Sequence, residues 1–233
     1  MRSISGAELL SQMRDAGGLV PGALVAERKG TADWVRGDLR YRITLKQADG
    51  AARWWVTVGD HQLGGSFQEG GILASVPIRP VPEQPAIAWP ADDDEIVPFL
   101  RGLHARLANA VRFVADRRDL CGLLVSPTDV RRGDLVADLR TGYVERVLRA
   151  LCIAQAAGDA ESASVALAIL QAPPAGGPAD GPSSLLDQAR IWADQWSYQS
   201  GRQIHVPDAI VAPRPTRAAR PVPDADGFWE HVG

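Results

Sequence analysis

Cysteine is scarce in this chain, which has only Cys121 and Cys152 in its 233 residues. Two cysteines so far apart supply neither the disulfide framework of a small secreted domain nor the C-x-x-C pairs of a zinc knuckle. The sequence therefore predicts a reducing compartment, for which the cytoplasm is the default. Because Cys152 follows Leu151 at the edge of an apolar helical face, we expect its thiol to be buried and unreactive.

Long apolar runs are also missing. Residues 1–18 carry acidic and polar side chains where a signal peptide would need roughly 7 to 15 apolar residues. The longest uncharged stretch, residues 162–179, is broken by Pro173, Pro174 and Pro178, well short of the ~20 apolar residues of a membrane span. We therefore expect no secretion signal and no transmembrane helix.

The chain has no excess of basic residues, because 25 Lys and Arg stand against 28 Asp and Glu, for a net charge of -3. This balance argues against nucleic acid and against an anionic membrane as partners. Lysine is almost absent, and Lys29 and Lys46 are its two occurrences. Arginine therefore reflects a general bias of composition, and a single arginine is weak evidence for phosphate or base recognition.

Catalytic and cofactor motifs are missing as well. The glycine-rich loop from Gly64 to Gly71 lacks the Lys-Ser/Thr pair of a phosphate-binding loop. The acidic run at residues 92–95 lacks the glycine and the spaced acid of a calcium loop. Its position before a helical pattern indicates helix capping instead, with Asp94 as the capping residue. We therefore expect no cofactor, no metal site and a protein that is not an enzyme.

Asp60 and His61 come closest to an acid–base pair. A carboxylate beside an imidazole can fix the imidazole tautomer and raise its basicity. Adjacent residues of an extended segment point in opposite directions, however, which works against such a pair. A small hydrolase or ligand-binding enzyme, with its site near Asp60, His61 and the loop from Gly64 to Gly71, is the alternative hypothesis for function.

What the sequence does contain is a strong hairpin pattern. Residues 38–46 alternate between apolar and polar side chains, and residues 53–58 do so again after the turn-forming pair Asp49-Gly50. Weaker patterns at residues 23–28 and 72–76 extend the predicted antiparallel sheet to about four strands, with one face open to solvent. The inward side chains of the hairpin are expected to be Leu39, Tyr41, Ile43, Leu45, Trp54, Val56 and Val58.

Helical periodicity occurs both before and after the predicted strands in the sequence. It predicts helices over residues 6–16, 96–114, 142–157 and 160–170. The last two are separated by Gly158, a C-terminal cap, and Asp159, an N-terminal cap, which together indicate a tight αα-hairpin. A Pro/Gly linker over 171–182 leads to a further helix at 183–200 and a proline-rich, extended or disordered tail at 201–233.

This order of elements predicts an α+β domain over residues 1–170. The strand ending near Lys46, the Asp49-Gly50 turn, the WWVTVGD strand and the helix-Gly158-Asp159-helix hairpin resemble a bacterial family of small α+β proteins of unknown function. Some members of that family look like immunity proteins encoded beside toxins. The resemblance covers about residues 5–170 and implies a protein-binding role.

Two groups of residues are candidates for binding a protein partner. Trp55 projects to the opposite face of the hairpin among arginines, where it is either a cation–π platform or a surface covered by the C-terminal helix. Phe228 and Trp229 lie in an acidic terminal segment that either docks on a partner or folds back on its own domain. We therefore expect a cytoplasmic, non-enzymatic protein of the immunity or adaptor type. The arginines beside Trp55 are Arg40, Arg42 and Arg53.

Overall fold

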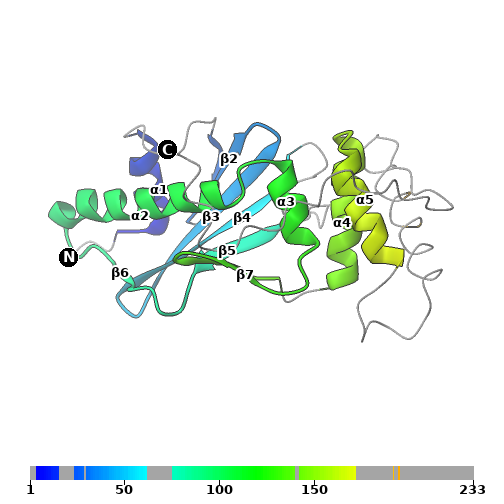
Figure 1. The fold of residues 1–233 in the computed structure, drawn as a ribbon. Helices are drawn as coiled ribbons and strands as arrows, with labels where there is room; N and C mark the ends of the chain where they lie inside the picture. Colours follow the sequence, from blue (N-terminus) through cyan, green and yellow to red (C-terminus); the bar gives the residue numbers. More distant parts are fainter. Residues whose placement is uncertain are drawn as a thin grey trace, which may run out of the picture. The chain divides into compact units, whose positions relative to one another are not determined.

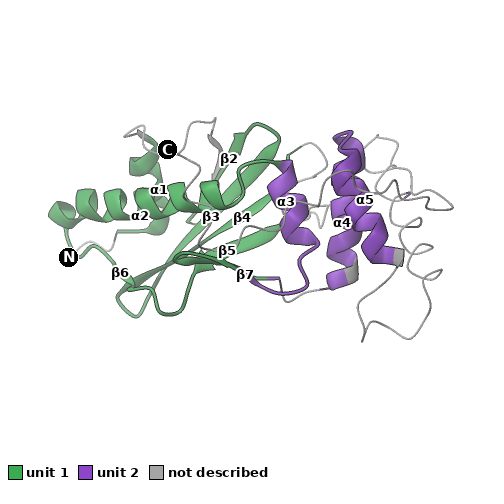
Figure 2. Ribbon diagram, in the orientation of Figure 1, with its two compact units in different colours: residues 1–61, 75–116, 131–138 green, residues 62–74, 117–130, 139–233 purple. Residues whose placement is uncertain are grey.

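The computed structural model describes residues 4–15, 24–28, 30–61, 75–139, 142–171, 191 and 194. The chain divides into two compact units (Figure 2). The first comprises residues 1–61, 75–116 and 131–138, and the second comprises residues 62–74, 117–130 and 139–233. The predicted strand residues 72–74, the glycine-rich loop and the tail lie outside the described residues, as do the Pro/Gly linker beyond Gln171 and the C-terminal helix apart from residues 191 and 194.

The fold is α+β, built on an antiparallel sheet (Figure 1). The strands follow the order β1-β2-β3-β4-β5-β8-β7, and β6 pairs separately with β4. The prediction of about four strands was therefore too low. The strands are β1 (Leu24–Arg28), β2 (Thr31–Arg36), β3 (Leu39–Ala48), β4 (Ala51–Asp60), β5 (Val76–Pro80), β6 (Ile87–Ala88), β7 (Val130–Arg132) and β8 (Leu135–Ala137).

The strands missed by sequence reasoning have physical reasons for being missed. The six-residue β2 was not predicted, because Asp33 and the adjacent apolar residues Trp34 and Val35 break its alternation. The strands β6, β7 and β8 have two or three residues each, too few to show an alternating pattern. The strand β5 starts at Val76, four residues later than predicted, and contains Pro77 and Pro80, which weaken any sequence-based strand prediction.

The hairpin of β3 and β4 is confirmed. Its residues pair without interruption from Leu39 opposite Asp60 to Ala48 opposite Ala51. The turn residues Asp49 and Gly50 have φ angles of 52° and 72°. Two successive positive φ values belong to the type I′ turn, whose twist matches that of the flanking strands. The seven side chains predicted to point inward are all buried.

Two helices of the first unit pack with this sheet: α1 (Gly6–Asp15) and α2 (Asp93–Phe113) (Figure 1). Tyr41 joins the sheet to the end of α2, because its hydroxyl donates to the carbonyl oxygen of Val114 at 2.7 Å. The Tyr41 ring also stacks on Trp34, with ring centroids 5.3 Å apart. Both side chains are fully buried, so this cluster lies at the centre of the core.

The helix α2 begins at a different cap from the one expected. Asp92, not Asp94, is the capping residue, and its carboxylate accepts from the backbone N–H of Glu95 at 3.2 Å. The Glu95 carboxylate in turn accepts from the N–H of Ala91 at 2.8 Å. Asp94 already lies inside the first helical turn and cannot occupy the capping position.

The second unit contains three described helices: α3 (Arg117–Leu124), α4 (Tyr143–Ala156) and α5 (Ala160–Gln171). The capping residues predicted between α4 and α5 are confirmed. Gly158 has a φ of 68°, and Asp159 accepts from the N–H of Ser162 at 3.2 Å. The eight-residue α3 was not predicted.

Arg146 of α4 holds the end of α3, because its buried guanidinium donates to the carbonyl oxygens of Leu124 at 3.0 Å and Ser126 at 2.9 Å. The carbonyl of Leu124, the last residue of α3, has no partner within the helix itself, and Ser126 lies just beyond the helix. Burial lowers the pKa of Arg146. None of the described helices is long and apolar enough to cross a membrane.

We expect Tyr41→Phe to lower the free energy of unfolding by about 1 to 2 kcal/mol, because it leaves the carbonyl of Val114 without its buried donor. Urea denaturation followed by circular dichroism measures the change. Tyr143→Phe is the control, since the Tyr143 hydroxyl donates to Val125 over a longer 3.2 Å and is only partly buried. Equal losses in the two variants would contradict the central role of Tyr41.

Candidate functional site

The polar face of the β3–β4 hairpin carries most of the residues that the sequence singled out. We call it the outer face, and it consists of the side chains that alternate with the buried ones. It brings Arg40, Arg42, Arg53 and Trp55 onto one surface, as predicted. The outer face also includes Thr44, Lys46 and Thr57 from the hairpin and Asp33 from the neighbouring β2. Thr44 and Asp33 are themselves buried, so the expectation of a sheet face open to solvent was wrong for this part of the face.

Arg40 and Arg42 are held by a buried carboxylate. Arg42 donates to both oxygens of Asp33, through Nε at 2.6 Å and Nη2 at 2.7 Å, and Arg40 adds a bond at 2.9 Å. Asp33 is only 1% exposed, and the two arginine side chains are 17% and 23% exposed. A carboxylate this buried needs such compensation. The structure therefore gives these two arginines a role in stability.

The opposite end of the outer face is more open. Lys46 lies directly across from Arg53 in the strand register, and both side chains are exposed. The Lys46 ammonium sits 5.5 Å from the centre of the partly buried Trp55 ring. Arg53 pairs with Asp49 in the turn at 3.1 Å, an ion pair in which both side chains are well exposed. Lys46, Arg53 and Trp55 therefore form an accessible cation–aromatic group, which we call the hairpin-end cluster.

Lys46 is the residue of this cluster that sequence reasoning missed. Its position was visible in the outward set of the first hairpin strand, but its contact with Trp55 was not. The diagonal from Lys46 to Trp55 depends on the register, which pairs Lys46 with Arg53 and Thr44 with Trp55. No signal in the sequence marks Lys46 for this role, because its contact with Trp55 depends on the strand register.

Asp60 and His61 lie in different environments, because Asp60 is buried and His61 is exposed. Asp60 ends β4 with its side chain 1% exposed, on the buried side of the strand. His61 is exposed, and its backbone N–H donates to the carbonyl of Asp38 at 2.7 Å. The described residues therefore do not bring the two together as an acid–base pair. The glycine-rich loop proposed beside them lies outside the described residues, and so do Phe228 and Trp229.

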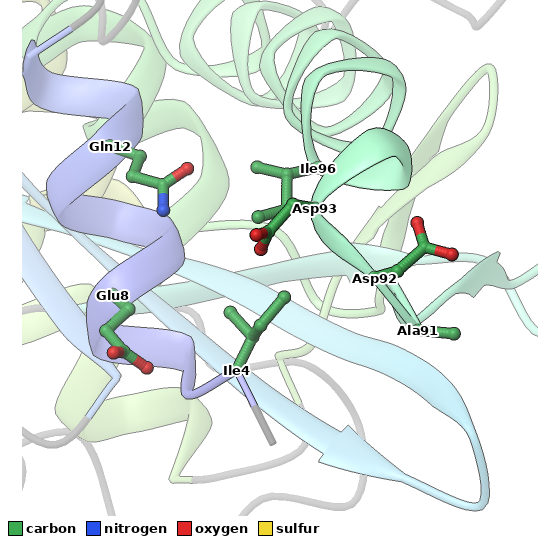
Figure 3. A pocket seen from close by; sticks show the side chains of 7 residues that line it. All are labelled: Ile4, Glu8, Gln12, Ala91, Asp92, Asp93 and Ile96. Carbon is green, nitrogen blue, oxygen red and sulfur yellow. The ribbon is translucent and has the colours of Figure 1, made fainter. Parts of the chain in front are cut away.

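A pocket of about 370 Å³ lies between the first turns of α1 and α2 (Figure 3). Ile4 and Ile96 provide its apolar lining, and Glu8 and Asp93 provide acidic groups. Glu8 caps its own helix, because its carboxylate accepts from the N–H of Ser5 at 2.9 Å. Among the described residues, no group of three or more His, Cys, Asp or Glu side chains is arranged to hold a metal ion.

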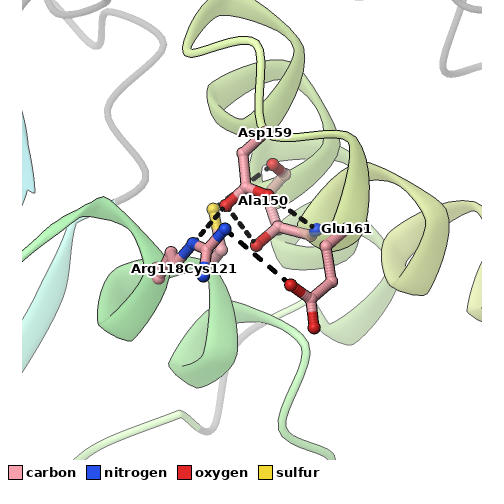
Figure 4. A network of polar contacts seen from close by, with 6 residues as sticks. Arg118, Cys121, Ala150, Asp159 and Glu161 are labelled. Carbon is pink, nitrogen blue, oxygen red and sulfur yellow. Dashed lines mark hydrogen bonds and ion pairs between the residues drawn. The ribbon is translucent and has the colours of Figure 1, made fainter. Parts of the chain in front are cut away.

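A polar network in the second unit joins α3 to the start of α5 (Figure 4). Arg118 lies 3.1 Å from the Asp159 carboxylate and 3.8 Å from Glu161. Asp159 also accepts from the Ser162 hydroxyl at 2.9 Å. Burial raises the pKa of Asp159, but the hydrogen bonds from Ser162 and the charge of Arg118 outweigh it, so the pKa is lowered overall.

Both cysteines are buried free thiols. Cys121 donates to the carbonyl of Ala150 at 3.6 Å, a contact drawn in Figure 4. Burial raises the pKa of Cys152 to about 12. The thiolate is the reactive form of cysteine, so the expectation of an unreactive Cys152 agrees with its surroundings.

We expect Asp33→Asn to lower the free energy of unfolding by about 2 to 3 kcal/mol, because two partly buried guanidinium groups lose their counter-ion. The matched control is Asp49→Asn, which removes the exposed partner of Arg53 and should change stability by less than about 0.5 kcal/mol. Chemical denaturation of the two variants tests this. Similar losses of unfolding free energy in the two variants would show that the burial of Asp33 does not set the size of the effect.

The lowered pKa of Asp159 predicts acid sensitivity. Its carboxylate contributes stability above the ordinary pKa of 3.8, and this contribution disappears as the pH falls through the lower folded-state value. We expect Asp159→Asn to cost about 0.5 to 1 kcal/mol near neutral pH, since Asn still caps the helix but loses the ion pair. The difference from wild type should shrink in denaturation curves as the pH falls below 3.8. A difference independent of pH would contradict this prediction.

Comparison with known proteins gives no identity for the chain. No family model, no curated protein and no solved structure matches it. The resemblance to a bacterial family with immunity-like members therefore stays a prediction from the sequence.

Proposed function

We propose that this chain is a non-enzymatic protein-binding protein, of the immunity or adaptor type, that docks its partner on the hairpin-end cluster. The observation that carries the proposal is the Lys46 ammonium over the Trp55 ring, with Arg53 directly across the strand pair. Aromatic and arginine side chains are the residue types that contribute most binding energy in protein interfaces.

The cluster is partly ordered before any partner arrives. The backbone of β3 and β4 is fixed by continuous pairing, and Trp55 stands on it with part of its ring exposed. A lysine side chain loses much rotamer freedom when it is immobilised in an interface. Contact with the Trp55 ring restricts Lys46 in advance, which supports docking at this position.

Charge indicates the kind of partner. Among the described residues, Asp49 is the carboxylate paired with this group, so Lys46, Arg53 and Asp49 together carry a positive charge. The whole chain carries a net charge of -3 and does not attract polyanions over long distances. A local positive patch on a weakly acidic protein suits a protein partner with an acidic surface. We place this activity in the reducing cytoplasm, in keeping with the two buried free thiols.

The test compares capture of partners by three forms of the full chain. The immobilised wild type is exposed to a lysate of the cells that produce it, beside a Lys46→Glu, Arg53→Glu double variant and an Arg101→Glu, Arg112→Glu control. The control makes the same charge change on exposed positions of α2. Quantitative mass spectrometry compares what each form retains.

We expect one protein retained by the wild type to fall about tenfold with the hairpin variant and to stay within about twofold with the α2 control. Thermal melting of all three forms checks that the variants are folded. Retention of the same proteins by the hairpin variant would refute docking at this cluster. The absence of any protein retained above background would refute the protein-binding function itself.

A further inference from the structure

The hairpin-end cluster contains an unfavourable arrangement of like charges. Lys46 and Arg53 are direct cross-strand partners on the same face, where Cβ atoms are about 4.5 to 5.5 Å apart and like charges destabilise a sheet. Arg53 is turned toward Asp49, and Lys46 is turned toward Trp55. One anionic group placed between Lys46 and Arg53 is attracted by both and relieves their repulsion. The charge of this pair therefore suits one anionic group.

A partly exposed aromatic ring, that of Trp55, lies one step along the strands from this pair, while its cross-strand neighbour Thr44 is buried. The next pair on the outer face is Thr44 with Trp55, two residues from Lys46 and Arg53 along each strand. Two residues of an extended strand span about 6.8 Å. Trp55 is partly exposed there, with the Lys46 ammonium near one side of its ring. The cation pair and the Trp55 ring are thus separated along the strands by the repeat distance of an extended chain.

We propose, building on the docking function above, that the hairpin-end cluster recognises an extended acidic segment of the partner with a carboxylate and an apolar side chain at positions i and i+2. Only side chains two residues apart lie on the same face of an extended peptide at this spacing. The carboxylate binds between Lys46 and Arg53, and the apolar side chain packs on Trp55. Adjacent acidic and apolar residues cannot occupy both positions at once.

The surroundings favour a carboxylate on a protein over a nucleic-acid phosphate. Nucleic acids bind through many phosphate contacts, each of which needs a cation. Among the described residues, the hairpin end offers the exposed Lys46 and Arg53. Arg40 and Arg42 are held by the buried Asp33, and Arg79, beside Trp55 on β5, is paired with Asp138. A short acidic segment matches this small number of charges.

Two peptides of identical composition test the spacing. The first is Gly-Thr-Glu-Thr-Phe-Thr-Glu-Thr-Gly, in which Glu and Phe are two residues apart. The second is Gly-Thr-Glu-Phe-Thr-Thr-Glu-Thr-Gly, in which Phe is one and three residues from the two Glu. Both carry fluorescein, and anisotropy measures binding to the full chain at low salt. We expect the first peptide to bind about fivefold more tightly.

Variants of the protein assign the effect to the cluster. Lys46→Met keeps the aliphatic stem but removes the charge, and Trp55→Thr keeps a good strand former but removes the ring. Each should weaken the first peptide about threefold to fivefold and reduce its advantage over the second. The control Arg101→Gln, on the exposed surface of α2, should bind both peptides like the wild type. Melting curves confirm that each variant is folded.

Three results would overturn the proposal: equal affinity for both peptides, an advantage that survives Lys46→Met, or tighter binding of a twelve-residue oligothymidylate than of the first peptide. If the peptides do not differ but capture of the cellular partner still depends on Lys46 and Arg53, the spacing rule is wrong and the docking function stands. If that capture does not depend on them, the docking function is wrong as well.

Discussion

The register of β3 against β4 is the constraint on which the first unit depends. The pairing runs without a break from the turn at Asp49 and Gly50 to the far end of both strands. Because side chains alternate, a shift by one residue would move Tyr41 out of the core and an arginine into it. Tyr41 contacts both the neighbouring Trp34 and the end of α2, so the same register also positions that helix. The positive φ angles of the turn leave little freedom for another pairing.

This register also divides the basic residues of the outer face into two kinds. Arg40 and Arg42 reach the buried carboxylate of Asp33 and stabilise the sheet. Lys46 and Arg53, at the turn end, remain exposed beside Trp55. Of the three arginines that the sequence placed beside Trp55, Arg40 and Arg42 are thus committed to structure and Arg53 is not. The surface proposed for binding lies at the turn end of the hairpin, where side chains are exposed and Lys46 lies directly opposite Arg53.

The second unit is organised by its helix ends. A helix leaves its first N–H groups and its last carbonyls without internal partners, and side chains must supply them. Asp159 does this from the adjacent position in sequence, and Arg146 does it for α3 from a different helix. The local cap was recognisable from the residue type and the preceding Gly158. The distant one was not, because nothing near Arg146 in the sequence indicates which carbonyls it will reach.

The sequence by itself determined the α+β class, the β3–β4 hairpin with its turn, and the main course of α1, α2, α4 and α5. These features follow from periodicity and capping, which act within a few residues. Only the tertiary structure decided the strand β2, the short strands and the helix α3, because these elements are stabilised by their neighbours and not by a pattern of their own. The choice of Asp92 over Asp94 as the cap of α2 is local, but three successive aspartates leave it open in the sequence. It also decided the roles of Arg42 and Lys46. Both are basic residues on one face of one strand, and their difference arises from the buried carboxylate that cross-strand pairing brings to one and not to the other.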